Sequence, residues 1–155
     1  MLIYEIPGRR LEIHQLVLDF NGTIACDGRL QPGVAERLCA LADQVRVYVL
    51  TADTFGTAAT ACRDLPVMLT TVDSRAGGPD KERLITELGA EYTAAIGNGV
   101  NDSLMGSRAA LSLLVLGPEG AAVAAIQQAD VVFTSILDAL DFLLKSKRVV
   151  ATLRP

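Results

Sequence analysis

The feature that most constrains the fold is a regular alternation of short apolar runs with segments of helical periodicity. After an apolar run that ends near residue 20, five further apolar runs alternate with amphipathic segments, and the loops between them are short. Strands that alternate with helices pair in parallel through right-handed crossovers, so the helices cover both faces of one sheet. The sequence therefore predicts an α/β domain, a three-layer, Rossmann-like arrangement around a parallel central sheet.

The hydrophobic periodicity also gives approximate bounds for the elements. Two extended runs, 2–6 and 11–20, lie on either side of Pro7-Gly8 and predict an N-terminal β-hairpin. The other expected strands are 45–50, 67–72, 92–96, 111–116 and 131–133. The expected helices are 32–42, 55–64, 79–88, 101–109, 120–128 and 136–144, and Ser135 is the expected N-cap of the last.

Length and composition exclude several classes of protein. With 155 residues, half of them hydrophobic, the chain fits one domain over residues 1–155 with a core that needs no disulfides. The net charge is −4 and the basic residues are dispersed, so we expect no nucleic-acid partner. The chain contains no apolar run of about 18 residues, which argues against a membrane segment. We expect a cytoplasmic soluble protein.

Polar residues follow four of the expected strands, at Asp19, at Thr51, before Lys81 and at Asn98 to Asp102. The carboxyl ends of parallel strands share one edge of a sheet, where ligands bind. Each position also has a simpler interpretation. Asp19 alone would be an ordinary turn former, and Thr51 would be an N-cap for the helix expected at residue 55.

The chemistry of these positions suits one phosphate site. Gly22 lets the loop after Asp19 turn close to an anion, and the Thr51 hydroxyl can donate to a phosphate oxygen. Lys81 falls in the first turn of its expected helix, where a cation opposes the helix dipole, unless it is an exposed lysine paired with Asp80 or Glu82. The oxygens of residues 98–102 suit Mg²⁺, although a flexible Asn/Gly turn would have the same composition.

Together, four segments resemble the ordered motifs of the haloacid dehalogenase superfamily. They are Asp19-Phe20-Asn21-Gly22-Thr23, Thr51-Ala52-Asp53, Lys81 and Gly97-Asn98-Gly99-Val100-Asn101-Asp102. Within that superfamily, the second and fourth segments are most similar to the phosphorylation domain of P-type ATPases and its soluble relatives. The resemblance implies a Mg²⁺-dependent phosphohydrolase or phosphotransferase that works through an aspartyl phosphate on Asp19.

The resemblance also implies roles for individual residues. The implied catalytic residues are Asp19, Asn21, Thr51 and Lys81. The implied phosphate-binding residues are Phe20, Gly22, Thr23, Thr51, Ala52, Lys81 and Asn101. The implied Mg²⁺ ligands are Asp19, Asn21 (through its backbone carbonyl), Asn98 and Asp102.

Two positions depart from the family pattern. Phosphatases of the superfamily commonly carry an Asp two residues after the nucleophile as a general acid and base, and here Asn21 cannot transfer a proton. Asn98 replaces a metal-binding Asp, which predicts a weaker metal site. These changes keep a second hypothesis open, a catalytically weakened phosphate-binding or regulatory domain.

The spacing between the motifs leaves no room for a cap domain, so we expect an open site. Uncapped members act on large substrates or close their sites by oligomerising, so we expect a phosphorylated small molecule or phosphoprotein as substrate, and a homo-oligomer as one means of closure. A response-regulator receiver fits less well, because its acidic pair ends the first strand and its phosphorylated Asp comes later. A dinucleotide-binding domain would need GxGxxG after Leu18, which is missing.

Overall fold

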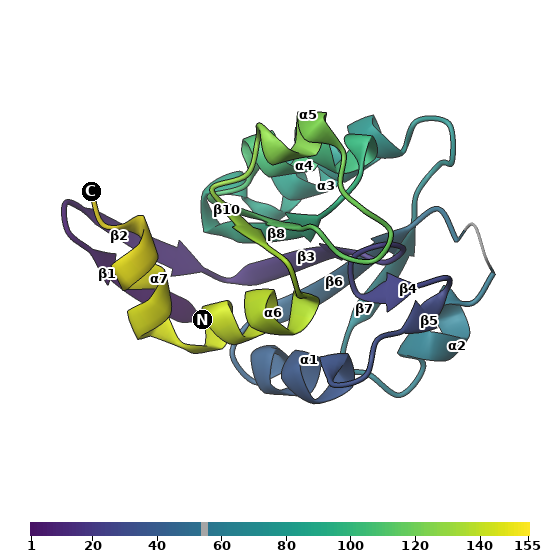
Figure 1. Cartoon of the computed structure of the whole chain (residues 1–155), viewed down its shortest axis with the longest axis horizontal. Helices are drawn as coiled ribbons and strands as arrows, with labels where there is room; N and C mark the ends of the chain where they lie inside the picture. Colours follow the sequence, from purple (N-terminus) through teal and green to yellow (C-terminus); the bar gives the residue numbers. More distant parts are fainter. Residues whose placement is uncertain (54–55) are drawn as a thin grey trace.

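Six parallel strands form the central sheet of the computed structural model, which describes residues 1–53 and 56–155. Their spatial order is β10–β9–β8–β3–β6–β7 (Figure 1). The strands are β3 (Gln15–Asp19), β6 (Arg46–Thr51), β7 (Met68–Thr71), β8 (Thr93–Gly97), β9 (Leu111–Val115) and β10 (Val131–Phe133). Every neighbouring pair is parallel, so the expected parallel α/β sheet is confirmed.

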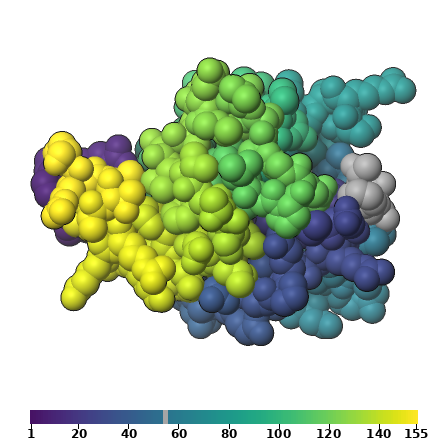
Figure 2. All heavy atoms as spheres, viewed as in Figure 1, coloured from purple at the N-terminus to yellow at the C-terminus, as the bar shows by residue number. Residues whose placement is uncertain are grey.

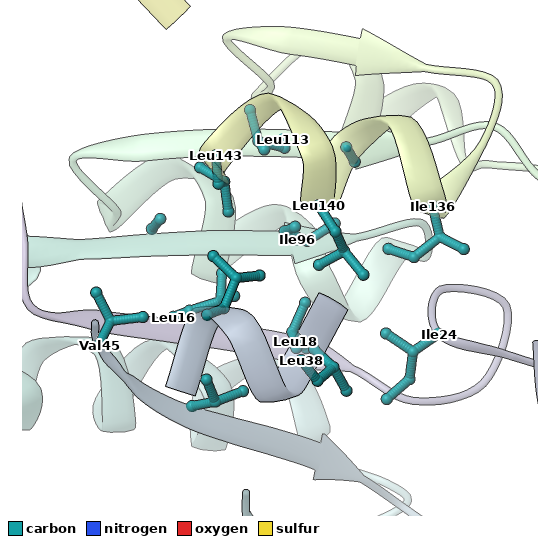
Figure 3. Packing of buried hydrophobic residues seen from close by; sticks show 14 of the residues in the cluster. Leu16, Leu18, Ile24, Leu38, Val45, Ile96, Leu113, Ile136, Leu140 and Leu143 are labelled. Atoms are coloured by element: carbon teal, nitrogen blue, oxygen red, sulfur yellow. The ribbon is translucent and has the colours of Figure 1, made fainter. Parts of the chain in front are cut away.

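Helices cover both faces of this sheet because successive side chains of the buried strands point to opposite sides. Leu16 and Leu18 of β3 belong to a core shared with α1 (Val34–Ala42), α2 (Ala58–Cys62) and α6 (Ile136–Leu144). Figure 3 shows their packing with Leu38 of α1 and Leu140 of α6. Val17 belongs to a second core, shared with α3 (Gly77–Leu88) and α4 (Ser103–Arg108). The three-layer arrangement is therefore confirmed.

The N-terminal hairpin is present, but its second strand is shorter than expected. The run 11–20 divides at His14 into β2 (Arg9–Ile13), which pairs antiparallel with β1 (Leu2–Ile6), and β3, which joins the central sheet. An unpredicted helix, α7 (Ser146–Leu153), lies beside the hairpin (Figure 1). The buried hydroxyl of Tyr4 donates to the carbonyl of Leu143 over 2.7 Å, which ties the hairpin to the end of α6.

Several other bounds differ from the expected ones for local reasons. Gly33 has a φ of +87°, so α1 begins at Val34, and the expected start of the next helix, Phe55, lies outside the described residues. Short elements that the sequence did not predict are β4 (Ala25–Cys26), β5 (Arg29–Leu30) and the 3₁₀ helices η1 (Ala90–Tyr92) and η2 (Val100–Asp102).

The helix expected over residues 120–128 is reduced to α5 (Val123–Ile126) because the chain first makes a tight turn. Gly120 has a φ of +77°, and its N–H donates to the carbonyl of Gly117 over 2.9 Å. Across residues 1–53 and 56–155, none of the helices has the length and hydropathy required to cross a lipid bilayer.

Candidate active site

Three neighbouring strands end side by side at one edge of the sheet and carry the polar residues there. Asp19 is the last residue of β3, Thr51 ends β6 and Gly97 ends β8, and β3 lies between the other two. A pocket of about 170 Å³ opens at this edge. Its lining residues are Asp19, Asn21, Thr51, Ala52, Asn98, Gly99 and Asn101.

Lys81 approaches the same point from α3 and is almost fully buried, with an exposure of 1%. Its Nζ lies 2.5 Å from Oδ1 of Asp19 and 2.7 Å from Oδ1 of Asp102. The alternative partners do not bind it, since Asp80 pairs with Arg83 and Glu82 pairs with Arg108. Lys81 is therefore held by the buried carboxylates.

The expectation that Lys81 lies in the first turn of its helix is wrong. Helix α3 begins at Gly77, which makes Lys81 its fifth residue. The helix starts early because Asp73 accepts hydrogen bonds from the N–H groups of Arg75 and Ala76 just before it. Pro79 is tolerated there, since the N–H groups of a first turn have no partner within the helix. The ion pairs explain the position of Lys81 and the helix dipole does not.

Two carboxylates share one ammonium group in this cluster, which leaves one negative charge in excess. Burial raises the pKa of Asp19 to about 7, and the nearby Asp102 adds to the rise, while Lys81 and the Thr23 hydroxyl oppose it. For Lys81, burial lowers the pKa, but the two carboxylates outweigh that effect and leave it raised. A buried excess of negative charge favours a bound cation.

Asp102 organises the loop after β8 as well as binding Lys81. Its Oδ2 accepts hydrogen bonds from the N–H groups of Asn98 and Gly99, both over 2.9 Å. This approach depends on Gly97, where an added Cβ would lie 2.4 Å from Cγ of Asp102. Both carboxylate oxygens of Asp102 are thus engaged by protein donors, unlike those of an open metal ligand.

The loop after Asp19 is closed on itself. The N–H of Phe20 donates to Leu50, the N–H of Gly22 to Ala25 and the N–H of Thr23 to Phe20, and the Phe20 side chain is part of the core. The structure therefore does not bring Phe20, Gly22 and Thr23 to the pocket lining as the expected phosphate cradle. The Thr23 hydroxyl instead lies 3.4 Å from Oδ2 of Asp19 and 3.2 Å from Oδ1 of Asn98.

Asn21 and Thr51 both lie in the pocket with groups suited to a ligand. The Asn21 Oδ1 is buried and has no hydrogen-bond partner among the described residues. The Thr51 Oγ1 accepts from the N–H of Asp53 over 2.8 Å, which leaves the Thr51 hydroxyl as a donor. The N-cap interpretation of Thr51 is wrong, because α2 begins at Ala58 and Thr57 precedes it.

Solved structures with the same fold are known. A protein named as a HAD family hydrolase from Streptomyces avermitilis superimposes with a TM-score of 0.68 at 21% identity, covering 91% of this chain and 88% of that one. A 3-deoxy-D-manno-octulosonate 8-phosphate phosphatase of Moraxella catarrhalis, in complex with magnesium, phosphate and its sugar, gives 0.72 at 16% identity over 92% and 94%. The chain has the haloacid dehalogenase fold.

Part of an ion-transporting ATPase has the same fold as this chain. A zinc-transporting PIB-type ATPase superimposes with a TM-score of 0.64 at 22% identity. The match covers 79% of this chain and only 20% of the ATPase. The similarity to a P-type ATPase that the motifs indicated therefore extends to the fold.

Sequence comparison gives two short relatives from Methanocaldococcus jannaschii, and no protein-family model matches. The uncharacterized protein MJ0072 is 51% identical over 39 residues, which are 25% of this chain and 89% of that protein. The chain therefore belongs to the same family as MJ0072. The uncharacterized protein MJ0073 is 48% identical over 60 residues, or 39% of this chain and 64% of its own length.

Some residues that shape this site were not predicted. Gly77 and Gly78 form the face of α3 that lies against residue Asn101, where an added Cβ would come within 3.6 Å of Asn101 atoms. The Gly77-Gly78 pair next to Pro79 was the visible signal, although a Cβ at either position would make only ordinary contact with its neighbours. The contacts of Gly120 with the loop after β8 had no sequence signal, because they join distant segments.

Proposed function

We propose that the protein is a Mg²⁺-dependent phosphohydrolase or phosphotransferase that works through an aspartyl phosphate on Asp19. The observation that carries the proposal is the buried Asp19–Lys81–Asp102 cluster, with its excess negative charge, whose Asp19 lines the pocket. A nucleophilic carboxylate at the end of a central strand, with a lysine fixed beside it, is suited to attack on a phosphorus centre.

The residues of the pocket divide the chemistry between them. An Asp19 oxygen forms the new bond to phosphorus as the bond to the leaving oxygen breaks, and the leaving oxygen takes a proton from water. Lys81, which contacts Asp19 from α3, and the Thr51 hydroxyl of the pocket lining hold the phosphoryl oxygens, and Asn101 also lines the pocket. Water then hydrolyses the aspartyl phosphate, or another acceptor takes up the phosphoryl group.

The donor set fits Mg²⁺. Asp19, whose Oδ2 has only the long contact to Thr23, and Asn21, whose Oδ1 lacks a partner among the described residues, offer hard oxygens in the pocket. The Asn21 backbone carbonyl completes the proposed set. The Asn98 side chain is engaged by Thr23 and Gly120, and Asp102 contributes charge while it holds Lys81. When bound, Mg²⁺ neutralises phosphoryl charge. The magnesium and phosphate of the Moraxella enzyme support the assignment.

Asn21 gives specific support to a second candidate, a phosphate-binding or regulatory domain with little turnover. An amide at this position cannot accept or donate the proton that hydrolysis requires. The same residue predicts a long-lived aspartyl phosphate if the enzyme is active. The two candidates therefore differ in whether Asp19 is ever phosphorylated.

The substrate that we propose is a phosphorylated small molecule or a phosphoprotein that reaches an open site. A sugar phosphate is the substrate class of the Moraxella enzyme, and it is the first class to test. We also propose that residues 1–155 form one uncapped domain, and that a homo-oligomer closes the site.

The test is an aryl phosphatase assay on the wild type and on Asp19→Asn, each with Mg²⁺ and with a chelator. The proposal expects slow turnover that requires both Asp19 and Mg²⁺. Inorganic phosphate binding without any turnover in the wild type would favour the regulatory candidate. Equal turnover in wild type and Asp19→Asn would contradict both.

A further inference from the structure

Asn98 is bound by protein groups on all four of its polar atoms or groups. Its N–H donates to Asp102, its backbone carbonyl accepts from the N–H of Ala122 over 2.8 Å, and its Oδ1 accepts from the Thr23 hydroxyl over 3.2 Å. Its Nδ2 donates to the carbonyl of Gly120 over 3.1 Å. One side chain thus joins three segments that are distant in the sequence.

The segment 117–122 makes two of these hydrogen bonds, through the Gly120 carbonyl and the Ala122 N–H. It lies beside the loop that follows Asp19. Its Glu119 carboxylate accepts from the N–H of Asp27 at the tip of the β4–β5 hairpin over 3.3 Å. In Figure 2 this segment lies directly against the hairpin. Gly22, in the loop between Asp19 and the hairpin, packs under Asn98, since an added Cβ there would come 2.4 Å from Nδ2.

We propose that Asn98 is a positioning residue that braces segment 117–122 against the Asp19 loop, at the cost of a negative metal ligand. The inference rests on the proposed function, because it assigns this residue a reason for departing from the family's Asp. A carboxylate could accept the Thr23 hydrogen bond, but it has no N–H for the carbonyl of Gly120. The carboxamide of Asn98 serves both partners.

Asn98→Asp should lower the stability of the metal-free protein and raise its affinity for Mg²⁺. Asn98→Asp places a carboxylate against the Gly120 carbonyl and adds a third acid beside Asp19 and Asp102, so the metal-free protein loses stability. The same carboxylate strengthens the site for a divalent cation. A residue with a purely structural role would lower both stability and Mg²⁺ affinity.

The experiment compares Asn98→Asp and Asn98→Ala with the wild type, and uses Asn101→Asp as the matched control. Asn101 is an exposed asparagine of the same loop, so its change adds the same charge without breaking the brace. The measurements are the thermal midpoint without metal, Mg²⁺ affinity by calorimetry, and amide hydrogen exchange of Gly120 and Ala122.

We expect both Asn98 variants to lower the thermal midpoint and to speed exchange of these two amides roughly five- to tenfold. Asn98→Asp, unlike Asn98→Ala, should also bind Mg²⁺ roughly tenfold more tightly. Exchange that is unchanged in Asn98→Ala, or a thermal midpoint that falls as far in Asn101→Asp as in Asn98→Asp, would overturn the proposal. None of the three readouts needs substrate, so a wild type without phosphatase activity would contradict the proposed function and leave this test intact.

Discussion

Lys81 is the only cation in contact with two buried carboxylates among the described residues, so its removal should be costly. We expect Lys81→Ala to lower the free energy of unfolding by about 3–5 kcal/mol, because it leaves Asp19 and Asp102 buried without a counter-charge. Denaturant unfolding of the metal-free protein measures this. Lys147→Ala, at an exposed lysine, is the control and should change stability by less than about 0.5 kcal/mol.

Combining Lys81→Ala with Asp19→Asn separates charge from packing. If excess charge causes the loss, the double variant is more stable than Lys81→Ala alone. Additive losses would mean that Lys81 matters for its packing and not for its charge.

The raised pKa of Asp19 makes stability depend on pH in a defined direction. Its pKa is 3.8 ordinarily and about 7 in the fold, so the folded state binds the proton more tightly than the unfolded state. The contribution of Asp19 to stability therefore falls as the pH rises from about 4 to about 7 and is constant above. Without metal, Asp19→Asn should be more stable than the wild type near pH 8, by on the order of 1–4 kcal/mol.

Thermal unfolding of both proteins across this pH range is the measurement. The difference should vanish near pH 4, and Mg²⁺ should reduce it near pH 8 by stabilising only the wild type. A wild type that is more stable than Asp19→Asn near pH 8 without metal would show that Lys81 fully compensates the Asp19 charge.

Asn21 limits turnover if hydrolysis of the phosphoenzyme needs a proton carrier. Asn21→Asp should raise kcat for an aryl phosphate by at least about tenfold, since a positioned acid-base group typically contributes about 10²- to 10⁴-fold. Steady-state kinetics with saturating Mg²⁺ measures the effect. A folded variant with unchanged or lower kcat would show that another group carries the proton or that chemistry is not the slow step.

At the scale of elements, the junction of β8 with the following loop depends on the absence of a side chain at Gly97. A methyl group there would meet Cγ and Cβ of Asp102 at 2.4 and 2.5 Å, so Gly97→Ala should displace that carboxylate from Lys81. We expect a loss of roughly 2–4 kcal/mol in the free energy of unfolding and loss of phosphate affinity.

Gly77→Ala is the matched control in α3. An added Cβ there meets its nearest neighbours only at 3.5 and 3.6 Å, which is ordinary contact, and alanine favours the helix. Its stability should equal or slightly exceed that of the wild type. Equal losses in the two variants would show that the loop after β8 tolerates movement of Asp102.

The elements that the sequence predicted well are those with many buried side chains. The apolar runs of β3 and β8 and the periodicity of α6, with its Ser135 cap, led to the right elements because burial requires apolar residues there. The β4–β5 hairpin has two-residue strands that bury little, so no pattern marks it. The division of residues 11–20 at His14 depends on pairing with distant strands, which a local pattern does not contain.

In the site too, topology predicted the positions of residues, whereas contacts made by tertiary packing were not predicted. Asp19, Thr51 and the loop after β8 were placed at one edge because topology alone brings strand ends together. The ion pairs of Lys81 and the cross-link of Asn98 involve atoms brought close only by the packing of α3 and segment 117–122. The roles of Lys81 and Asn98 therefore follow only from the three-dimensional structure.

For the whole molecule, the sheet order explains why the site can hold excess charge. Asp19 ends β3, which lies between β6 and β8 at the edge of the sheet where the pocket opens. Helices cover both faces of the sheet, so the Asp19 carboxylate is buried although the pocket is open. A three-layer scaffold keeps that geometry fixed. The one negative charge that Lys81 leaves uncompensated on Asp19 and Asp102 is the reason to expect a bound cation, which would in turn bind a phosphoryl group.

The most direct measurement of the central claim is to locate a phosphoryl group on the protein. Wild type and Asp19→Asn are incubated with acetyl phosphate and Mg²⁺, quenched in acid and mapped by peptide mass spectrometry. We expect one acid-stable phosphoryl group on Asp19, at a level raised by the slow hydrolysis that Asn21 imposes, and none in Asp19→Asn or without Mg²⁺. A phosphoryl group on another residue, or phosphatase turnover that persists in Asp19→Asn, would contradict it.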